Sequence, residues 1–441
     1  MTSSDTFNSA LSVLKSKIRD RTARVGVVGL GYVGLPLATE LGRSGFTVVG
    51  VDKSAGKVAE IEAGRCYIPD IQTELFDRLI RDEKLTASTS EDVLRECDAV
   101  IICVPTPLRK TRDPDLSFVI DAAEALAVRL KPGSLVILES TTYPGTTEEA
   151  ILPLLEGAGL TAGKDVFLCF SPERVDPGNE KYQTKQIPKV IGGVTAACIE
   201  AGFALYSQVM DTVVPVSSTR VAEMVKLLEN TFRMINIGLA NEMALMCDRM
   251  GIDVWEVIEA AATKPFGFMP FYPGPGLGGH CIPVDPHYLS WKIKQVGYEP
   301  RFIALASEIN GKMPEFIVEK VQGALNDARK PVKGSSIHVL GVAYKRDISD
   351  VRESPALDII ALLQRLGGVV TYSDPFVPQI DFDSGSLEAI PLFPAAENAD
   401  CVVIITDHRA FDYASVVERS SLIVDSRNAL KTFSSKNIVR L

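Results

Sequence analysis

A glycine-rich turn near the start of the chain restricts its fold more than any other feature. The apolar run from Arg24 to Val28 leads directly into the residues GLGYVGLPLATEL. A second apolar run, Phe46 to Val51, ends in Asp52, about twenty residues after the turn, which is the usual distance in dinucleotide-binding units. A strand, a turn with three glycines, a helix and an acid after the next strand together indicate such a unit. We therefore predict a doubly wound α/β sheet at the amino terminus.

The glycines of this turn and Asp52 each have an expected part in holding a dinucleotide. Gly29 would make the tight turn, Gly31 would let the backbone approach the pyrophosphate, and Gly34 would bring the helix close to the sheet. The N–H groups at the helix amino terminus would hold the phosphates. A carboxylate at Asp52 accepts hydrogen bonds from both ribose hydroxyls but repels a 2′-phosphate, so we expect NAD rather than NADP. Lys53 follows directly and would soften this preference, and a glycine-rich turn without a ligand is the alternative.

The composition excludes several classes of protein. The chain has 441 residues, of which 46% are hydrophobic, enough for two or three domains with substantial cores. Its formal net charge of -10 argues against a surface for nucleic acid or for an anionic membrane. No apolar run reaches the roughly 18 residues that cross a bilayer, and the segment from Met1 to Asp20 does not resemble a secretory signal, so we expect a cytoplasmic protein. The cysteines are scattered without the spacing of a disulfide framework, and most should be reduced and buried.

Short apolar runs in the amino-terminal half predict further strands of the same sheet. They are Cys97 to Val104, Leu135 to Glu139, and Phe167 to Phe170. Ligands of an open α/β sheet gather at the carboxyl ends of its strands, so the polar residues that follow these runs are candidates for chemistry. The candidates at these ends are Pro105, Thr106, Thr141 and Glu173. Ordinary turn residues would give the same pattern.

The stretch PFYPGPGLGGHCIPVDPHYLSW, residues 270–291, is predicted to be a shaped loop, because its glycines and prolines suit neither a helix nor a central strand. Glycines that would let backbone amides approach a ligand are Gly274, Gly276, Gly278 and Gly279. Cys281 follows them, and its thiolate could act as a nucleophile beside that ligand. The possible metal ligands of the loop are His280, Cys281, Asp285 and His287. Zinc sites usually need a second cluster, which the chain lacks, so we expect no metal; a turn with a buried cysteine is the other interpretation.

The middle of the chain is predicted to be helical. A long helix from Ser218 to Met250 would place Lys226 and Asn230 on one face, four residues apart. Lys226 could equally be a surface lysine, and a helix this long and apolar suggests a subunit interface. Helical spacing recurs in Asp253 to Ala262 and in Glu299 to Leu325, where we expect an interruption near Met313 and Pro314.

The last third repeats the pattern of the first. Strands are predicted at Ile337 to Ala343, Val369 to Tyr372, Ala399 to Thr406 and Leu422 to Asp425, with a helix at Pro355 to Leu366. We expect a second doubly wound sheet without a second NAD, because its first turn lacks two of the fingerprint glycines. Cations that could close on phosphates there are Lys345, Arg346, Arg352 and Arg427. The expected domains are residues 1–215, 216–328 and 329–441.

Several separated motifs resemble the UDP-glucose/GDP-mannose dehydrogenase family over nearly the whole chain. They are GLGYVGLPLA at 29–38, VPTP at 104–107, ESTTYPGTT at 139–147, SPER at 171–174, KLLEN at 226–230, GGHCIPVD at 278–285 and KRDISDVRESP at 345–355. The resemblance implies an NAD-binding domain, a helical middle that forms a homodimer or a larger homo-oligomer, and a carboxyl-terminal domain that binds a nucleotide sugar. It also implies oxidation of the sugar's primary alcohol to a carboxylate with two NAD per turnover.

The resemblance also implies a role for each residue of the motifs. Cys281 would capture the aldehyde, Lys226 and Asn230 would stabilise the oxyanion, and a last group would position or activate water, namely Asp285, Thr141 and Glu173. The residues implied to bind NAD are Gly29, Gly31, Tyr32, Val33, Gly34, Asp52, Lys53, Pro105, Thr106, Thr141 and Arg352. Those implied to bind the UDP-sugar are Glu173, Arg174, Val175, Lys226, Asn230, Tyr272, Gly276, Gly278, Gly279, Lys345 and Arg427.

One departure bears on the substrate. Members that act on UDP-glucose tend to show PEFLRE after the strand, whereas this chain has PERVDPGN, with Asp176 and Pro177 near the second acidic position. This sequence and the cysteine loop are most similar to the branch that acts on UDP-N-acetylhexosamines, in particular UDP-N-acetylglucosamine. UDP-N-acetylgalactosamine, UDP-N-acetylmannosamine and UDP-glucose stay open as substrates. A sensor that binds a nucleotide sugar without chemistry is the remote alternative, and the joint presence of four residues argues against it, namely Cys281, Lys226, Asn230 and Asp285.

Overall fold

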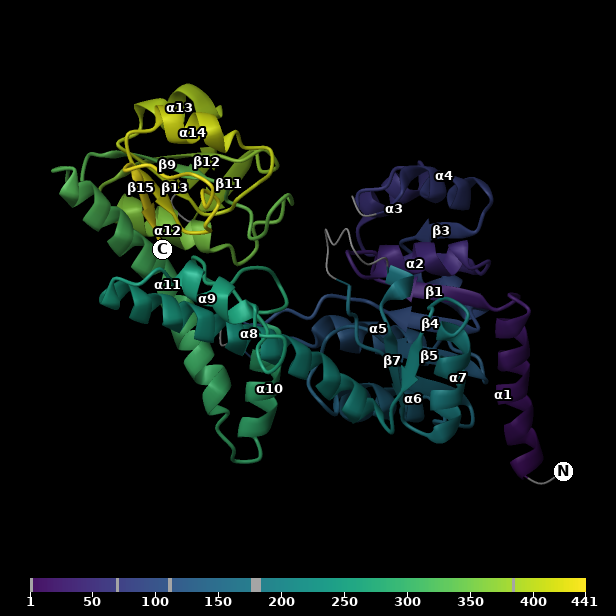
Figure 1. The fold of residues 1–441 in the computed structure, drawn as a ribbon. Coiled ribbons are helices and arrows are strands. Elements are labelled where there is room, and N and C mark those ends of the chain that lie inside the picture. Colours follow the sequence, from purple (N-terminus) through teal and green to yellow (C-terminus); the bar gives the residue numbers. More distant parts are fainter. Residues whose placement is uncertain (1–2, 69–70, 110–112, 176–183, 383–384) are drawn as a thin grey trace. The chain divides into compact units, whose positions relative to one another are not determined.

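The chain divides into two compact units. A computed structural model describes residues 3–68, 71–109, 113–175, 184–382 and 385–441 (Figure 1). The first unit comprises Met1–Glu229 and Trp291–Val296, and the second comprises Asn230–Ser290 and Gly297–Leu441. Each unit contains its own sheet of mainly parallel strands, so the predicted α/β class with two doubly wound sheets is confirmed. The three domain boundaries expected from the sequence stay predictions.

The first unit is built on an eight-stranded sheet with the order β3-β2-β1-β4-β5-β6-β7-β8. Its strands are β1 (Arg24–Val28), β2 (Thr47–Val51), β3 (Leu85–Ser88), β4 (Ala99–Ile102), β5 (Ser134–Leu138), β6 (Val166–Phe170), β7 (Lys189–Gly193) and β8 (Val213–Pro215). Neighbouring strands are parallel, except that β7 runs antiparallel to β6. The expected strands before β7 are therefore present, with ends within about two residues of prediction, the usual uncertainty of such boundaries.

Helices cover both faces of this sheet. They are α1 (Ser3–Arg19), α2 (Gly34–Arg43), α3 (Ala55–Glu62), α4 (Thr73–Arg81), α5 (Ser117–Ala127), α6 (Leu152–Gly157) and α7 (Ala196–Tyr206), with shorter helical turns η1 (Glu91–Glu96), η2 (Thr147–Ile151) and η3 (Thr184–Gln186). Alternate strand residues point to opposite faces, which makes two cores. Val25 and Val27 pack with α1, α2, α4 and α7, whereas Val28 and Val100 pack with α5 and α6.

Two corrections concern helices that the sequence analysis missed. The amino-terminal lead forms α1, whose Leu11, Leu14 and Ile18 are buried in the core shared with α7. The end of the stretch predicted as a loop forms α10 (Asp285–Lys294). Its proline, Pro286, lies in the first turn, where a helix needs no N–H donor, so the residue is compatible with a helix start.

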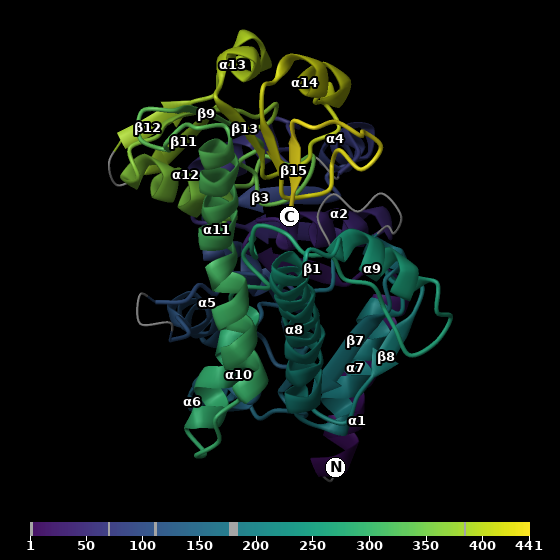
Figure 2. The ribbon, with the colours of Figure 1, turned by 60° about the vertical axis from the view of Figure 1, so that its left-hand side comes forward.

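The second unit joins the middle helices to the carboxyl-terminal sheet (Figure 2). The sheet has the order β10-β9-β13-β14-β15, all parallel, from β9 (Ser336–Leu340), β10 (Val369–Ser373), β13 (Cys401–Ile404), β14 (Ile423–Asp425) and β15 (Ile438–Arg440). Beside it lie the hairpin of β11 (Gln379–Phe382) and β12 (Gly385–Glu388) and the helices α12 (Pro355–Arg365), α13 (Leu392–Asn398) and α14 (Tyr413–Arg419). Residues of α8, α9 and α11 share one hydrophobic core with β9 and α12.

The long helix expected in the middle is α8 (Thr219–Met250), and it is followed by α9 (Val254–Ala262) and α11 (Arg301–Asp327). The predicted interruption at Pro314 is wrong, because α11 continues through this buried proline. Met313 and Ile317 beside this proline are buried in the core of the second unit, and their burial offsets part of the cost of the missing N–H. Among the described residues, no helix combines the length and the apolar character needed to span a bilayer.

Candidate active site

The turn between β1 and α2 has the geometry that its glycines require. Gly29 has a φ of 92°, and a Cβ there would lie 2.6 Å from the carbonyl oxygen of Cys103. A Cβ on Gly34 would lie 1.8 Å from the carbonyl oxygen of Gly29, so α2 can begin this close to the strand only with glycine. At Gly31, by contrast, a Cβ would meet none of the described residues within 4 Å. This open side and the N–H groups at the start of α2, where Val33 precedes the helix, fit a pyrophosphate.

Asp52 follows β2 and faces the same turn. Its Oδ2 accepts the N–H of Leu30 at 2.9 Å and pairs with the Nζ of Lys57 at 3.2 Å. Lys53, which the sequence analysis considered as the neighbouring cation, pairs instead with Asp121 at 2.9 Å. Lys57 is thus a charged neighbour of Asp52 that the sequence analysis missed, since no motif marks a residue in the first turn of α3. Its Oδ1 accepts the N–H of Ser54 at 2.9 Å, so both carboxylate oxygens already have donors within the protein, out of the roughly four acceptor positions that a carboxylate offers.

The predicted residues at the strand ends lie along one edge of the first sheet. The register pairs the last residues of β4, β5 and β6 with one another, and Pro105, Thr141 and Glu173 each follow three residues later. Pro105 is exposed, whereas Thr106, Thr141 and Glu173 are half-buried. Parallel strand direction therefore brings together the polar positions that the sequence placed far apart.

Glu173 is held as a carboxylate anion. Its Oε1 accepts the N–H groups of Arg174 at 2.7 Å and of Val175 at 2.5 Å, and its Oε2 lies 3.6 Å from the Nζ of Lys189. Burial alone would raise the pKa of Glu173, but Lys189, the backbone donors and Lys226 outweigh burial and lower that pKa. Only 12% of its side chain is exposed. A fixed anion of this kind can orient a water molecule.

The helix α8 is attached to the loops that follow β5 and β6. Glu223 is buried and accepts the N–H of Gly145 at 2.5 Å and of Thr147 at 2.9 Å. Burial raises the pKa of Glu223 to about 7, in spite of these donors. Lys226, which is 8% exposed, lies one turn further along this helix and lowers the pKa of Glu173 through its charge.

Arg174, which the family resemblance assigns to the substrate, also ties the loop after β6 to α8. Its Nη2 lies 2.7 Å from Oε1 of Glu229, and its Nη1 donates to the carbonyl of Pro188 at 2.6 Å. The neighbouring Val175 is half-buried. Asp176 and Pro177, on which the substrate prediction depends, lie outside the described residues.

In the second unit, three of the predicted catalytic residues lie close together. The carbonyl of Cys281 accepts the N–H of Val284 at 3.1 Å and that of Asp285 at 2.8 Å, so a tight turn separates the thiol from the start of α10. Asp285 is buried, and its Oδ2 accepts a hydrogen bond from the Nδ2 of Asn230 at 2.5 Å. Cys281 and Cys66 are half-buried, while the other cysteines of the chain are buried.

The glycines of the cysteine loop have a packing role that the sequence analysis did not anticipate. A Cβ on Gly278 would lie 2.5 Å from the Cβ of Tyr344, and a Cβ on Gly279 would lie 2.8 Å from the ring of the same tyrosine. Gly276 approaches Pro355 in the same way, at 3.2 Å. These glycines let the loop lie directly against residues 344–355 of the carboxyl-terminal part.

Two of the predicted cations, Arg352 and Arg427, contact this loop within the second unit, and Tyr272 is part of the loop. Arg352 pairs with Asp350 at 2.6 Å, and its carbonyl accepts the N–H of Gly279 at 3.0 Å. A Cβ on Gly274 would lie 2.7 Å from Nη1 of Arg427, whose buried Nε has no hydrogen-bond partner among the described residues. Tyr272 stacks on Trp255 with 6.2 Å between ring centroids, and Lys345 is half-buried.

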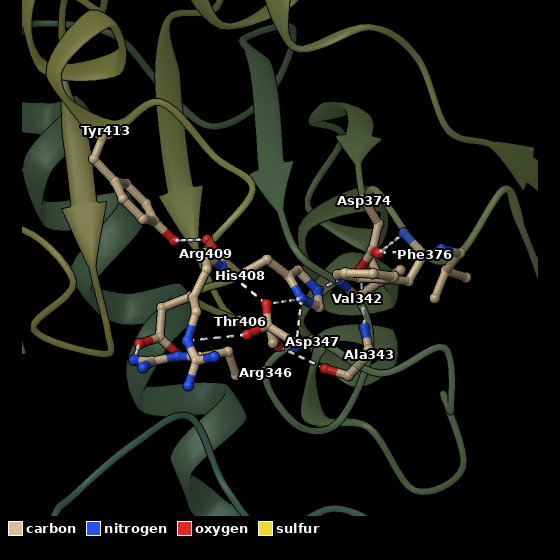
Figure 3. A network of polar contacts seen from close by, with 12 residues as sticks. Val342, Ala343, Arg346, Asp347, Asp374, Phe376, Thr406, His408, Arg409 and Tyr413 are labelled. Carbon is tan, nitrogen blue, oxygen red and sulfur yellow. Dashed lines mark hydrogen bonds and ion pairs between the residues drawn. The ribbon is translucent and has the colours of Figure 1, made fainter. Parts of the chain in front are cut away.

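A buried network at the strand ends of the second sheet was missed from the sequence (Figure 3). Oδ2 of Asp374 accepts the N–H groups of Val342 at 2.7 Å and of Ala343 at 3.2 Å, and it lies 3.0 Å from the Nε2 of His408. The Nδ1 of His408 accepts the N–H of Asp347 at 2.9 Å, so the ring proton is on Nε2 and points to Asp374. In the turn that follows β9, the N–H groups of Val342, Ala343 and Asp347 are thus engaged within the protein.

Arg346 and Arg409 border this network. Arg346 pairs with Asp407, and Arg409 pairs with Asp347, with 3.4 Å between its Nε and the carboxylate. Burial lowers the pKa of Arg427, which follows β14 at the same edge of the sheet. A cluster of guanidinium groups at the carboxyl ends of parallel strands suits a ligand with phosphate groups.

These features fit one class of protein: a dehydrogenase that binds a dinucleotide on its first sheet and has a half-buried cysteine, Cys281, on a glycine loop. Models of the UDP-glucose/GDP-mannose dehydrogenase family match the chain in three parts. The NAD binding domain covers residues 23–210, the central domain covers 220–312, and the UDP binding domain covers 338–432.

Individual relatives agree with this match. The chain is 39% identical to UDP-N-acetyl-D-glucosamine 6-dehydrogenase of Pseudomonas aeruginosa over 81% of this chain and 84% of the relative. It is 34% identical to UDP-N-acetyl-D-mannosamine dehydrogenase of Methanococcus maripaludis over 94% and 93%. The solved structure of UDP-D-ManNAc dehydrogenase from Pyrococcus horikoshii is 35% identical, with a TM-score of 0.86 over 95% of this chain and 98% of that one.

The chain belongs to the UDP-glucose/GDP-mannose dehydrogenase family. It is an NAD-dependent oxidoreductase of the kind that acts on UDP-sugars, which confirms the predicted enzyme class and cofactor.

Asp52 is predicted to determine the preference for NAD. Asp52→Asn should raise kcat/KM with NADP relative to NAD by about 10-fold or more, because removing a repelling charge is worth at least about 1.4 kcal/mol at short range. The replacement also leaves Lys57 beside the 2′-phosphate. Steady-state kinetics with both dinucleotides would measure the change, and Lys57→Ala in the same background should reverse part of it. A parent enzyme that already uses both cofactors equally would refute the assignment.

Proposed function

We propose that the chain oxidises the primary alcohol of UDP-N-acetylglucosamine to the uronic acid in two successive oxidations. The overall reaction consumes one alcohol, two NAD and one water, and it yields one carboxylate, two NADH and three protons. The observation that carries the proposal is Cys281, half-buried in a glycine loop, four residues before an Asp285 that is held by Asn230.

The first oxidation needs a group that takes the alcohol proton. NAD supplies the hydride acceptor for both oxidations when it is bound at the turn around Gly31. Glu173 is already an anion with a lowered pKa, so it can hold a water molecule that relays the proton away from the substrate hydroxyl. Thr141, at the equivalent position after the neighbouring strand, can donate a hydrogen bond to the same water or to the hydroxyl.

Cys281 carries the chemistry between the two oxidations. Its thiolate adds to the aldehyde carbon, which forms a C–S bond and turns the carbonyl oxygen into the oxyanion of a thiohemiacetal. Lys226 and the Asn230 amide would stabilise that oxyanion. Loss of the second hydride from the same carbon then leaves a thioester on Cys281.

Hydrolysis completes the reaction. A water activated by Asp285 or Glu173 attacks the thioester carbon, the C–S bond breaks, and Cys281 leaves as a thiolate. In the structure Asp285 is buried and already accepts one hydrogen bond from Asn230. That bond fixes the position of the Asp285 carboxylate.

The N-acetylglucosamine preference rests on the PERVDPGN sequence and on the relatives. Pro177 stands near a position where relatives that act on UDP-glucose carry an acid, and a neutral residue suits a neutral acetamido group better than a charged one. The Pseudomonas aeruginosa relative bears the name of this activity, whereas the Methanococcus maripaludis relative bears that of the mannosamine epimer.

Cys281→Ala is predicted to abolish acid formation, because neither the thiohemiacetal nor the thioester can form without the sulfur. The first oxidation should persist at a low rate, so single-turnover NADH formation would be about half of the parent amplitude or less. Mass spectrometry of the quenched parent enzyme should place the acyl adduct on Cys281. Cys66→Ala, at the other half-buried cysteine, is the matched control and should keep full acid production. An adduct on a different cysteine would remove Cys281 from the mechanism.

The substrate is decided by comparing four UDP-sugars with one enzyme preparation. UDP-N-acetylglucosamine should give the highest kcat/KM, above UDP-N-acetylgalactosamine, UDP-N-acetylmannosamine and UDP-glucose. A dedicated hydrogen bond to the acetamide would discriminate by about 10⁴-fold, whereas added room alone gives roughly 10- to 200-fold. UDP-glucose as the best substrate would contradict the proposal.

We also propose that α8 forms the homodimer interface. Its exposed face carries an apolar stripe of Met224, Leu228, Phe232, Leu239, Met246 and Met250, each more than 40% exposed. The spacing of four or seven residues places these side chains along one side of the helix. Such a stripe is large for a surface that faces only water.

Leu239→Glu is predicted to weaken the dimer. A charge at the centre of an apolar interface should raise the dimer dissociation constant at least about 30-fold, as the loss of a hot spot worth about 2 kcal/mol does. Sedimentation velocity over a dilution series would measure the constant. Val128→Glu, at a valine directly after α5 that is 67% exposed compared with 55% for Leu239, should leave the dissociation constant unchanged. A monomeric parent enzyme at micromolar concentration would refute this interface.

A further inference from the structure

The first unit buries a group of ionisable side chains beside Glu173. Glu139, directly after β5, and Lys189, the first residue of β7, form an ion pair with 2.7 Å between Oε2 and Nζ. Their side chains are 0% and 6% exposed. The hydroxyl of Tyr206, at the end of α7, donates to the other oxygen of Glu139. None of these three residues has a part in the reaction described above.

The direction of β7 explains how Lys189 reaches this place. Because β7 is antiparallel to β6, its first residue lies at the carboxyl ends of β5 and β6, where a parallel strand would place its last. The register pairs Phe170 with Gly192, and its continuation brings Lys189 opposite Glu173. The Nζ of Lys189 is 3.6 Å from Glu173 and donates to the carbonyl of Pro172 at 3.3 Å.

We propose that Lys189 and Glu139 are a buried pair of positioning residues that fixes the Glu173 carboxylate and sets its basicity. The inference rests on the role proposed for Glu173. The ammonium group of Lys189 has three N–H donors. It faces three acceptors, the carboxylates of Glu139 and Glu173 and the carbonyl of Pro172, so each donor has one acceptor. An ion pair this deep is a costly way to join two strands, since apolar side chains do that equally well. It is a direct way to keep a neighbouring carboxylate charged.

The two members of the pair should act on Glu173 in opposite directions. Lys189 stabilises the Glu173 anion, whereas an ionised Glu139 repels it and competes for the same ammonium group. Burial raises the pKa of Glu139 to about 7, against the effect of Lys189, so the competition sets in near neutral pH. The other titratable or charged groups that face the cluster are Cys103 after β4, Tyr206 on α7, Lys226 on α8 and the adjacent Arg174.

The pKa of Glu173 is the decisive quantity, and it can be measured without catalysis. Infrared spectra of ¹³C-glutamate-labelled protein, taken as differences from Glu173→Gln, isolate the Glu173 carboxyl band over a pH series. In Lys189→Met this pKa should rise by about 1 to 3 pH units, the usual effect of an opposite charge at this distance. Lys189→Arg, which keeps the cation, should restore most of the shift, and Glu139→Gln should lower the pKa of Glu173. A purely structural pair would not produce shifts of opposite sign.

Kinetics of acid formation give the second readout. Lys189→Met should lower kcat about 10- to 100-fold with little change in KM, as expected for a misplaced reacting group. In the Glu173→Gln background Lys189→Met should not lower kcat further, because Lys189 acts through Glu173. Lys131→Met is the matched control, since it removes a lysine that pairs with Asp98 in the same unit at 3.1 Å, and it should keep the parent kcat.

The outcomes separate this inference from the proposed function. An unchanged Glu173 pKa in both Lys189→Met and Glu139→Gln overturns the inference. It is also overturned if Lys189→Met lowers kcat by the same factor in the parent enzyme and in Glu173→Gln. If Lys189→Met does not bind NAD and is therefore misfolded, Glu139→Gln decides: a lowered pKa of Glu173 supports the inference, and a raised or unchanged pKa overturns it. If the parent enzyme forms no acid from any UDP-sugar, the proposed function fails, and the infrared titration still decides whether the pair controls Glu173.

Discussion

Strand direction is the constraint on which the first unit depends. Parallel strands end at one edge of the sheet, so loops far apart in the chain deliver Thr106, Thr141 and Glu173 to neighbouring positions. The antiparallel β7 adds a lysine to the same edge by its first residue rather than its last. A single reversal of direction therefore supplies a buried cation where an all-parallel sheet would end in turn residues.

Buried and half-buried carboxylates anchor the loops around these strand ends in both units. Asp52, Glu173, Glu223 and Asp374 each accept at least one backbone N–H from a loop that follows a strand. Such bonds satisfy donors that would otherwise be buried without partners, and they fix the loops more firmly than side-chain packing alone. Thr141 and Glu173 thus lie on loops whose backbone N–H groups donate to carboxylates, those of Glu223 and of Glu173 itself.

The acid that follows the strand beside the first strand of each sheet, Asp52 after β2 and Asp374 after β10, engages the turn differently in the two sheets. In the first, Asp52 engages one N–H of the glycine turn, and the space at Gly31 stays open for a ligand. In the second, Asp374 engages the N–H groups of both Val342 and Ala343 and also faces His408. The N–H groups of Val342 and Ala343 are therefore engaged within the protein, and guanidinium groups of Arg346 and Arg409 lie at the border of this turn.

The sequence alone determined the α/β class, the dinucleotide turn, the long helix and the cysteine loop, because each depends on residues adjacent in the chain whose backbone requirements are specific. It did not reveal α10, whose Pro286 looks like a helix breaker until its position in the first turn is known. Nor did it reveal that Gly278 lies against Tyr344, or that Lys189 lies beside Glu139 and Glu173. Those contacts depend on which strands pair and in which direction, and only the tertiary structure decides that, since nothing in the local sequence of β7 differs from that of a parallel strand.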